Sequence, residues 1–181
     1  MSILKVDTIN EKTSGNGVAI PGHVIQVVSS EKTDTSSTST TVPTFTDTGL
    51  SCTITPKFNN SKILVQVNIG LGISQSVFNT MRVVRNIAGG SFSMISAADS
   101  ASNRTAAHAC VYDLDNQGMI YMQDFIHLDS PATTSAVIYK VQHGNSGGNG
   151  AIYINRSTRD NNTAAYDVRT TSRIILQEIA Q

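Results

Sequence analysis

Histidine is the residue type in this chain best suited to binding a metal or transferring protons near neutral pH. None of its four histidines lies at the spacing of H-x-x-x-H or beside a C-x-x-C pair, the arrangements that metal sites use. The four are His23, His108, His127 and His143. We therefore expect no metal site, and histidines that are exposed or half-buried.

The two cysteines, Cys52 and Cys110, fall on different predicted strands. The start of the chain lacks the apolar stretch of a signal peptide, so the protein is expected to be made in a cytosol, where disulfides are rare. We expect both cysteines as small side chains of the core.

One acidic stretch partly matches a calcium-binding loop. Asp113-Leu114-Asp115-Asn116-Gln117-Gly118 is followed by Asp124. Gln117 stands where the pattern has Asp or Asn, and Asp124 replaces the usual bidentate Glu. The flanking segments also have the character of strands, where the motif requires helices. We therefore expect a hairpin turn, which the same residue types favour.

Other patterns that carry chemistry are incomplete. The glycine-rich stretch from His143 to Gly150 has no Gly-Lys-Ser/Thr ending and no following helix, so it does not predict a phosphate site. A Gly-x-Ser-x-Gly elbow is absent from the sequence. Asp124 and Asp129 are acids of the kind that glycosidases pair, but sequence separation does not establish the distance that pairing requires. We expect neither an enzyme nor a cofactor.

Composition narrows the class of partner. Lys plus Arg and Asp plus Glu number 13 each, so no bulk positive charge attracts nucleic acid. The charged fraction is 14%, well below the roughly 25% of ordinary soluble domains, while Ser, Thr, Asn and Gly are abundant. No run of eighteen apolar residues predicts a membrane span. Such a polar but weakly charged surface is common in extracellular β scaffolds and virion fibres.

Alternating hydrophobicity predicts an all-β fold. The clearest strand is Lys62–Ile69, in which every second residue is Ile or Val. About nine strands at short spacing indicate an antiparallel β-sandwich of jelly-roll type, with the last strand beside the first. The other predicted strands are Val24–Val28, Leu50–Thr55, Met81–Arg85, Ala107–Tyr112, Met119–Leu128, Ala136–His143, Ala151–Asn155 and Arg173–Ile179.

Polar stretches between these strands predict exposed loops. Thr33–Thr41 and Ser96–Arg104 contain too little apolar surface to pack, and either is a candidate variable tip. The glycine-rich connection and the stretch after Asn155 supply small polar side chains to a tip. The candidate contact residues are Asn145, Ser146, Asn149, Asp160 and Asn161.

The first 22 residues differ from the remainder and predict an extended N-terminal β-arm, residues 1–22, before a sandwich domain, residues 23–181. Burying its aliphatic side chains would contribute on the order of 10 kcal/mol, less than the cost of ordering about twenty backbones. The arm is therefore expected to share its apolar face with other chains, unless it is a frayed terminus. Its docking residues are Leu4, Val6, Ile9, Val18 and Ile20.

Three stretches of the chain resemble virion proteins of tailed bacteriophages, particularly those of marine bacteria. The first is the arm from Leu4 to Gly22, the second is Ile54–Val65, and the third is the ending Glu178-Ile179-Ala180-Gln181. Together they cover about a quarter of the sequence. The resemblance implies a virion appendage of the tail-fibre type, a homotrimer whose arm docks onto other virion proteins or winds with its sister arms.

These expectations favour a non-enzymatic structural protein of the virion, assembled in the host cytoplasm and located on the tail or head surface. Within it, a tail or tail-fibre module with contact to a host-surface glycan or protein comes first. A capsid decoration or head fibre is the alternative, because a long shaft is missing. Two other classes stay open: a carbohydrate-binding β-sandwich module, and a depolymerase. Neither nucleic acid nor membrane is an expected partner.

Overall fold

The computed structural model describes residues 6, 8–12, 14–15, 17–18, 20–74, 77–99, 101–112, 118–147, 150–163 and 165–181. These residues form strands and connections without a helix, and accordingly none of them belongs to a helix able to cross a membrane. The strands are β1 (Val24–Lys32), β2 (Ser36–Thr38), β3 (Thr46–Ile54), β4 (Lys62–Ile73), β5 (Phe78–Ile87), β6 (Ser93–Met94), β7 (Ala109–Tyr112), β8 (Tyr121–Asp129), β9 (Val137–Asn145), β10 (Ile152–Ile154) and β11 (Ser172–Ile179).

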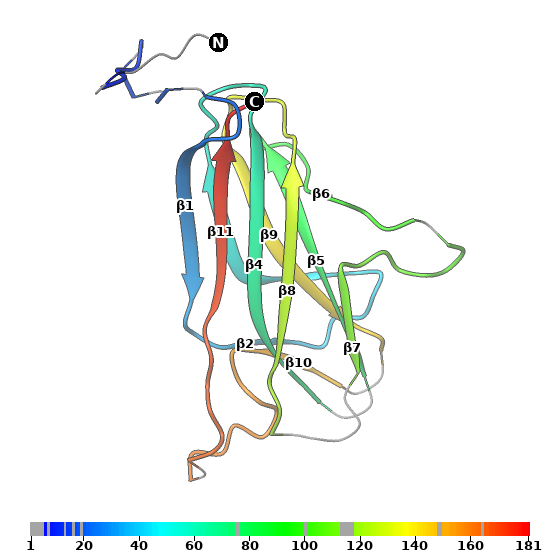
Figure 1. Ribbon diagram of the computed structural model, residues 1–181. Helices are drawn as coiled ribbons and strands as arrows, with labels where there is room; N and C mark the ends of the chain where they lie inside the picture. Colours follow the sequence, from blue (N-terminus) through cyan, green and yellow to red (C-terminus); the bar gives the residue numbers. More distant parts are fainter. Residues whose placement is uncertain are drawn as a thin grey trace, which may run out of the picture.

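The strands form two antiparallel sheets that pack face to face (Figure 1). One sheet has the order β1-β11-β4-β8, extended at one end by β10 and β2. The other has the order β3-β9-β5-β7, with β6 also paired to β5. Counting only the eight principal strands along the chain, the orders are 1-8-3-6 and 2-7-4-5, the double Greek key of a jelly roll. The predicted fold class is confirmed, and β11 lies beside β1 as expected.

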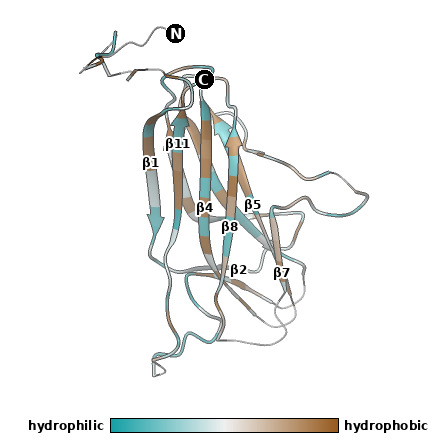
Figure 2. Ribbon diagram, viewed as in Figure 1, coloured by the Kyte–Doolittle hydropathy of each residue, from teal (hydrophilic) through white to brown (hydrophobic). Residues whose placement is uncertain are grey.

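The core lies between the sheets and follows the alternation of the sequence. Ile63, Val65, Val67 and Ile69 of β4 are each at most 3% exposed, whereas the residues between them are half-buried on the outer face. Tyr139 of β9 is the largest fully buried side chain opposite them. Figure 2 shows the resulting alternation of hydrophobic and hydrophilic bands along β4 and β8.

β4 continues beyond its predicted end at Ile69 to Ile73, and this extension contains Gly70 and Gly72. A Cβ at Gly70 would collide with the Thr170 hydroxyl, and a Cβ at Gly72 would collide with the Arg156 carbonyl oxygen. The β10–β11 connection therefore crosses β4 so closely that only glycine fits beneath it.

Several details differ from the sequence-based expectations. Thr33–Thr41 includes β2, which pairs with β10, because its hydroxyl groups bond to one another and its backbone completes a ladder. Cys52 is buried as expected, but Cys110 is exposed because it lies on the outer side of the short β7. His143 is buried at 1% exposure because it points inward from β9. The acidic stretch 113–117 lies outside the described residues.

Candidate interface surfaces

Residues 20–23, the β3–β4 turn and the end of β11 meet at one pole of the sandwich (Figure 1). The side chain of Glu178 is fully buried there. Its carboxylate accepts hydrogen bonds from the backbone N–H groups of Lys57 and Phe58, at 2.8 and 3.2 Å, and from the Gln26 amide at 2.5 Å. The ending of the chain thus holds the β3–β4 turn in place.

The arm leaves from the same pole. The backbone N–H of Gly22 donates to the Ala180 carbonyl at 2.8 Å, and the N–H of Ala180 donates to the His23 carbonyl at 2.9 Å. The chain is therefore fixed at residues 22–23 against the end of β11, and β1 begins directly afterwards at Val24.

Four of the five predicted docking residues of the arm are described and exposed. Val6 and Ile9 are 50% and 56% exposed, and Val18 and Ile20 are 36% and 37% exposed. Leu4 lies outside the described residues. Within the arm, the Glu11 carboxylate accepts hydrogen bonds from the N–H groups of Gly15 and Gly17. The turn is thus internally bonded, whereas the aliphatic side chains present unburied surface.

A second exposed apolar surface lies on the outer face of the β1-β11-β4-β8 sheet. Two cross-strand rows run across it, and we call them the outer apolar rows. Their aliphatic members on β8 are Ile126, 67% exposed, and Leu128, 45% exposed. By register, the first row is Val27, Gln177, Leu64 and Leu128, and the second is Ser29, Ile175, Gln66 and Ile126.

The next row of the same face is polar. Arg173 lies 3.6 Å from the Glu31 carboxylate, and the Asn68 amide donates to Asp124 at 2.6 Å. The outer apolar rows contain no charged side chain, and five of their eight members are aliphatic, so this face has an uncharged, mostly aliphatic centre with a charged border. Protein–protein interfaces have that arrangement, with charge depleted at the centre and concentrated at the rim. The sequence does not predict this surface, because Met119–Leu128 alternates as a half-buried strand would, and both of its faces carry apolar residues.

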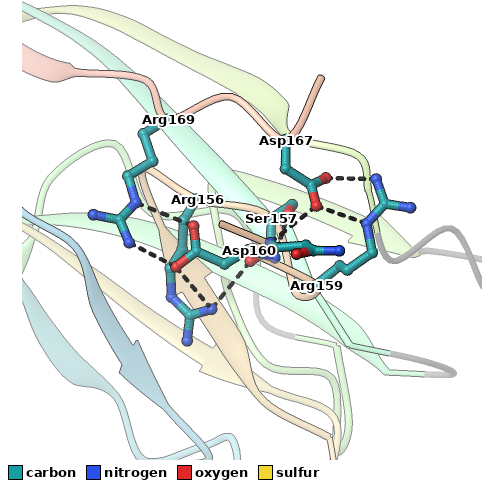
Figure 3. Close-up of polar contacts among 7 residues, drawn as sticks. Arg156, Ser157, Arg159, Asp160, Asp167 and Arg169 are labelled. Carbon is teal, nitrogen blue, oxygen red and sulfur yellow. Dashed lines mark hydrogen bonds and ion pairs between the residues drawn. The ribbon is translucent and has the colours of Figure 1, made fainter. Parts of the chain in front are cut away.

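The β10–β11 connection at the opposite pole is cross-linked by two carboxylates (Figure 3). Asp160 accepts two hydrogen bonds from Arg169, at 2.8 and 3.0 Å, and lies 3.8 Å from Arg156. Asp167 accepts two from Arg159, at 2.5 and 2.7 Å. The hydrogen bonds from these guanidinium groups hold the pKa of each carboxyl below its ordinary value. A loop that looks irregular in the sequence is therefore braced by ion pairs.

The candidate contact residues occupy different environments. Asp160 is committed to the ion pairs, and Asn161 is exposed, with its side-chain oxygen accepting from Thr163. Asn145 is fully buried rather than at a tip, because its amide donates to the Gly150 carbonyl and accepts from the Gly147 N–H. Ser146 is exposed beside it. Asn149 lies outside the described residues.

The two acids Asp124 and Asp129 point to opposite faces of β8. Asp129 is buried between the sheets, where Arg85 donates to both carboxylate oxygens and the Tyr139 hydroxyl donates at 2.7 Å. Burial beside Asp129 raises the pKa of the Tyr139 hydroxyl above its ordinary value. Asp124 points outward toward Asn68. The pair therefore cannot flank one substrate bond, and Asp129 joins the two sheets.

His108 and His127 both pack against the Phe125 ring, with their ring centroids 4.3 and 6.1 Å from its centroid. His108 accepts from the Val83 N–H through Nδ1, and its other ring nitrogen lies 2.7 Å from the Ile95 carbonyl oxygen, so it holds the β6–β7 connection on β5. Burial lowers the pKa of His108. Among the described residues, no three His, Cys, Asp or Glu side chains gather as a metal site would require.

Comparison with known proteins gives distant structural likenesses. No family model matches the sequence, and no curated protein matches it. Three solved structures from infectious bursal disease virus are similar in structure: the Gx strain (12% identity, 86% of this chain, 37% of that chain, TM-score 0.43), the VP2 subviral particle (10%, 86%, 38%, 0.41) and the Gt strain (12%, 98%, 41%, 0.41). The present chain spans about two fifths of the length of those chains. At such identities and TM-scores, the likeness assigns no role to it.

Proposed function

We propose that the chain is a non-enzymatic structural module of a tailed-phage particle, a homotrimer on a tail or tail-fibre assembly whose outer surfaces contact a host-surface glycan or protein. The observation that carries the proposal is the exposed surface of the outer apolar rows, in which Ile126 on the edge strand β8 is 67% exposed. A protein that presents such a surface beside a charged border gains stability by covering it.

The arm supports the same proposal. Its exposed Val6 and Ile9 find no cover on the sandwich of their own chain, and a short segment cannot stabilise itself in water. Contact with other virion proteins or with sister arms supplies the missing burial. The resemblance to phage particle proteins also supports this proposal. The three stretches that carry it are the arm, the segment around the β3–β4 turn and the end of the chain, and the hydrogen bonds of Glu178 and Ala180 bring them to one pole.

Light scattering on the purified full-length chain tests the proposal. We expect a mass three times that of one chain, and a monomer at all concentrations would contradict it. A head decoration or head fibre remains the alternative within the same class, because it would use the same surfaces. A labelled antibody against the chain, imaged on intact particles, distinguishes tail from head.

A further inference from the structure

The outer face of the β3-β9-β5 sheet carries a groove of about 710 Å³. Three segments line it: the first is Val42, Pro43 and Phe45 before β3, and the second is Arg82 on β5. The third runs from Met94 on β6 through Ala97 to residues 102–106 of the β6–β7 connection. That connection stands away from the sandwich in Figure 1. The groove lies on the sheet opposite the outer apolar rows, so an oligomer built on those rows leaves it open.

Arg82 brings an incompletely paired positive charge to the groove. Its Nε donates to Gln142 at 2.9 Å, and its guanidinium carbon lies over the Phe45 ring, 3.9 Å from the centroid. The nearby Asp47 carboxylate already bonds to Lys140 and Gln142, at 2.8 and 2.7 Å. Among the described residues, none provides an acceptor for the terminal nitrogens of Arg82, so they are available to donate to a ligand.

Arg104 adds a second cation from the opposite wall. It is exposed, and the described part of the chain supplies its side chain with no ion pair. Asp47 attracts Arg82, and Asp99 lies with Arg104 along an adjoining hollow of about 550 Å³, but neither carboxylate lines the groove. Among the described residues that line the groove, none carries a carboxylate. A ligand in the groove therefore meets two guanidinium groups, and carboxylates suit their forked donors.

The remaining lining favours a saccharide over an extended peptide. Ser102, Asn103 and Thr105 supply short hydroxyl and amide groups that match sugar hydroxyls. Phe45 with Arg82 on its face forms a flat platform. An added peptide strand needs a free sheet edge, but β5 is paired on both sides around Arg82, with β9 and with β6 and β7.

We propose that this groove binds an acidic saccharide, a glycan bearing carboxylates such as uronic acids, with Arg82 and Arg104 as its anion contacts. The inference rests on the proposed function and names the ligand class of the surface contact. The proposed ligand contact therefore lies on the outer face of the β3-β9-β5 sheet, and not at the contact residues that the sequence suggested.

Isothermal titration of the full-length protein with oligogalacturonate tests the proposal, with a neutral maltooligosaccharide and poly-glutamate as comparison ligands. We expect oligogalacturonate to bind, and Arg104→Ala or Arg82→Gln to weaken its binding about tenfold, the effect of losing one charge-assisted contact. Arg173→Ala is the matched control, because Arg173 is an exposed arginine on the other sheet, paired with Glu31. It should bind like the wild type.

Three results would overturn the inference: no binding of oligogalacturonate, binding of poly-glutamate at least as tight, or equal losses in all three arginine variants. If Arg82→Gln disturbs folding, the exposed Arg104→Ala alone decides. Light scattering on the same samples keeps the two proposals apart. Trimers that do not bind the oligosaccharide refute only the groove, whereas monomers refute the proposed function.

Discussion

The buried carboxylate of Glu178 accepts a hydrogen bond from the backbone N–H of Lys57 at 2.8 Å, across 121 positions of the chain. The same oxygen accepts from Phe58, and the other accepts from Gln26. One side chain therefore satisfies donors from the β3–β4 turn and from β1 at the pole where the arm leaves.

Glu178→Ala should lower the free energy of unfolding by about 3 kcal/mol, because it leaves the part-buried backbone N–H groups of Lys57 and Phe58 and the Gln26 amide without their acceptor. Urea denaturation followed by circular dichroism measures the change. Glu31→Ala is the control, since that exposed carboxylate makes only a 3.6 Å ion pair and should change stability little. Equal stability of the two variants would show that the turn does not depend on Glu178.

Asp129→Ala should lower the free energy of unfolding by about 3 kcal/mol, because it leaves Arg85 and the Tyr139 hydroxyl between the sheets without their acceptor. Tyr139→Phe, which removes only one hydrogen bond, should cost about 1 kcal/mol. Asp124→Ala on the opposite face of the same strand serves as the control and should stay close to the wild type. Thermal unfolding of the three variants ranks them, and a different order would argue against the cross-sheet role of Asp129.

Ile126→Lys should dissociate the oligomer without lowering the stability of each subunit, because the side chain is 67% exposed in the single chain. A charge within the outer apolar rows would have to be buried on association. Analytical ultracentrifugation measures the mass. Val168→Lys, at a position 57% exposed in the β10–β11 connection, should leave assembly intact. Retention of the wild-type mass by Ile126→Lys would place the interface elsewhere.

Acid should destabilise the fold through His143. Burial lowers its pKa from 6.5 to about 4, and its Nδ1 has no hydrogen-bond partner within the described residues. Between pH 6.5 and pH 4, His143 binds a proton in the unfolded chain but stays neutral in the folded chain. The stability gained from the lowered pKa is complete above pH 6.5 and is lost as the pH falls toward 4, by about 3 kcal/mol.

The measurement is the free energy of unfolding in urea at pH 7 and pH 5, for the wild type and for His143→Gln. The variant should show a smaller difference between the two pH values. The pH dependence of the unfolding free energy that remains in the variant comes from other groups, including His108, whose pKa is also lowered by burial. An unchanged difference would mean that His143 does not titrate in this way.

Asp167→Asn should open the β10–β11 connection to trypsin at Arg159, because that arginine is held by two hydrogen bonds to Asp167. The melting temperature of the sandwich should change little, since the connection lies outside the core. Mass spectrometry of timed digests identifies the cleavage site. A digestion pattern identical to that of the wild type would show that the ion pair does not restrain the loop.

The fold class was predictable because alternation of Ile and Val needs only one buried face to be recognised, as in β4. The features that the sequence did not predict correctly depend on contacts between segments that are distant in the sequence. Nothing local to Gly70 and Gly72 reveals that another connection crosses over them. The burial of Asn145 likewise depends on closure of its loop onto Gly150, so its residue type suggested an exposed tip.

The surfaces were predictable to an unequal extent. The arm stood out because its aliphatic residues are isolated from the main alternating pattern. The outer apolar rows did not, because they are assembled from β1, β11, β4 and β8, which are adjacent only after folding. The groove around Arg82 also joins three segments that are separated in the sequence.

The hydrogen bond between Gly22 and Ala180 has a practical consequence for protein engineering. Because the chain segments at both ends of the sandwich meet there, a linker of a few residues could join residue 23 to residue 180. New ends could then be opened in the exposed part of the β10–β11 connection. Such a circular permutant would remove the arm while retaining every strand, and would present any fused reporter at the pole opposite the original ends.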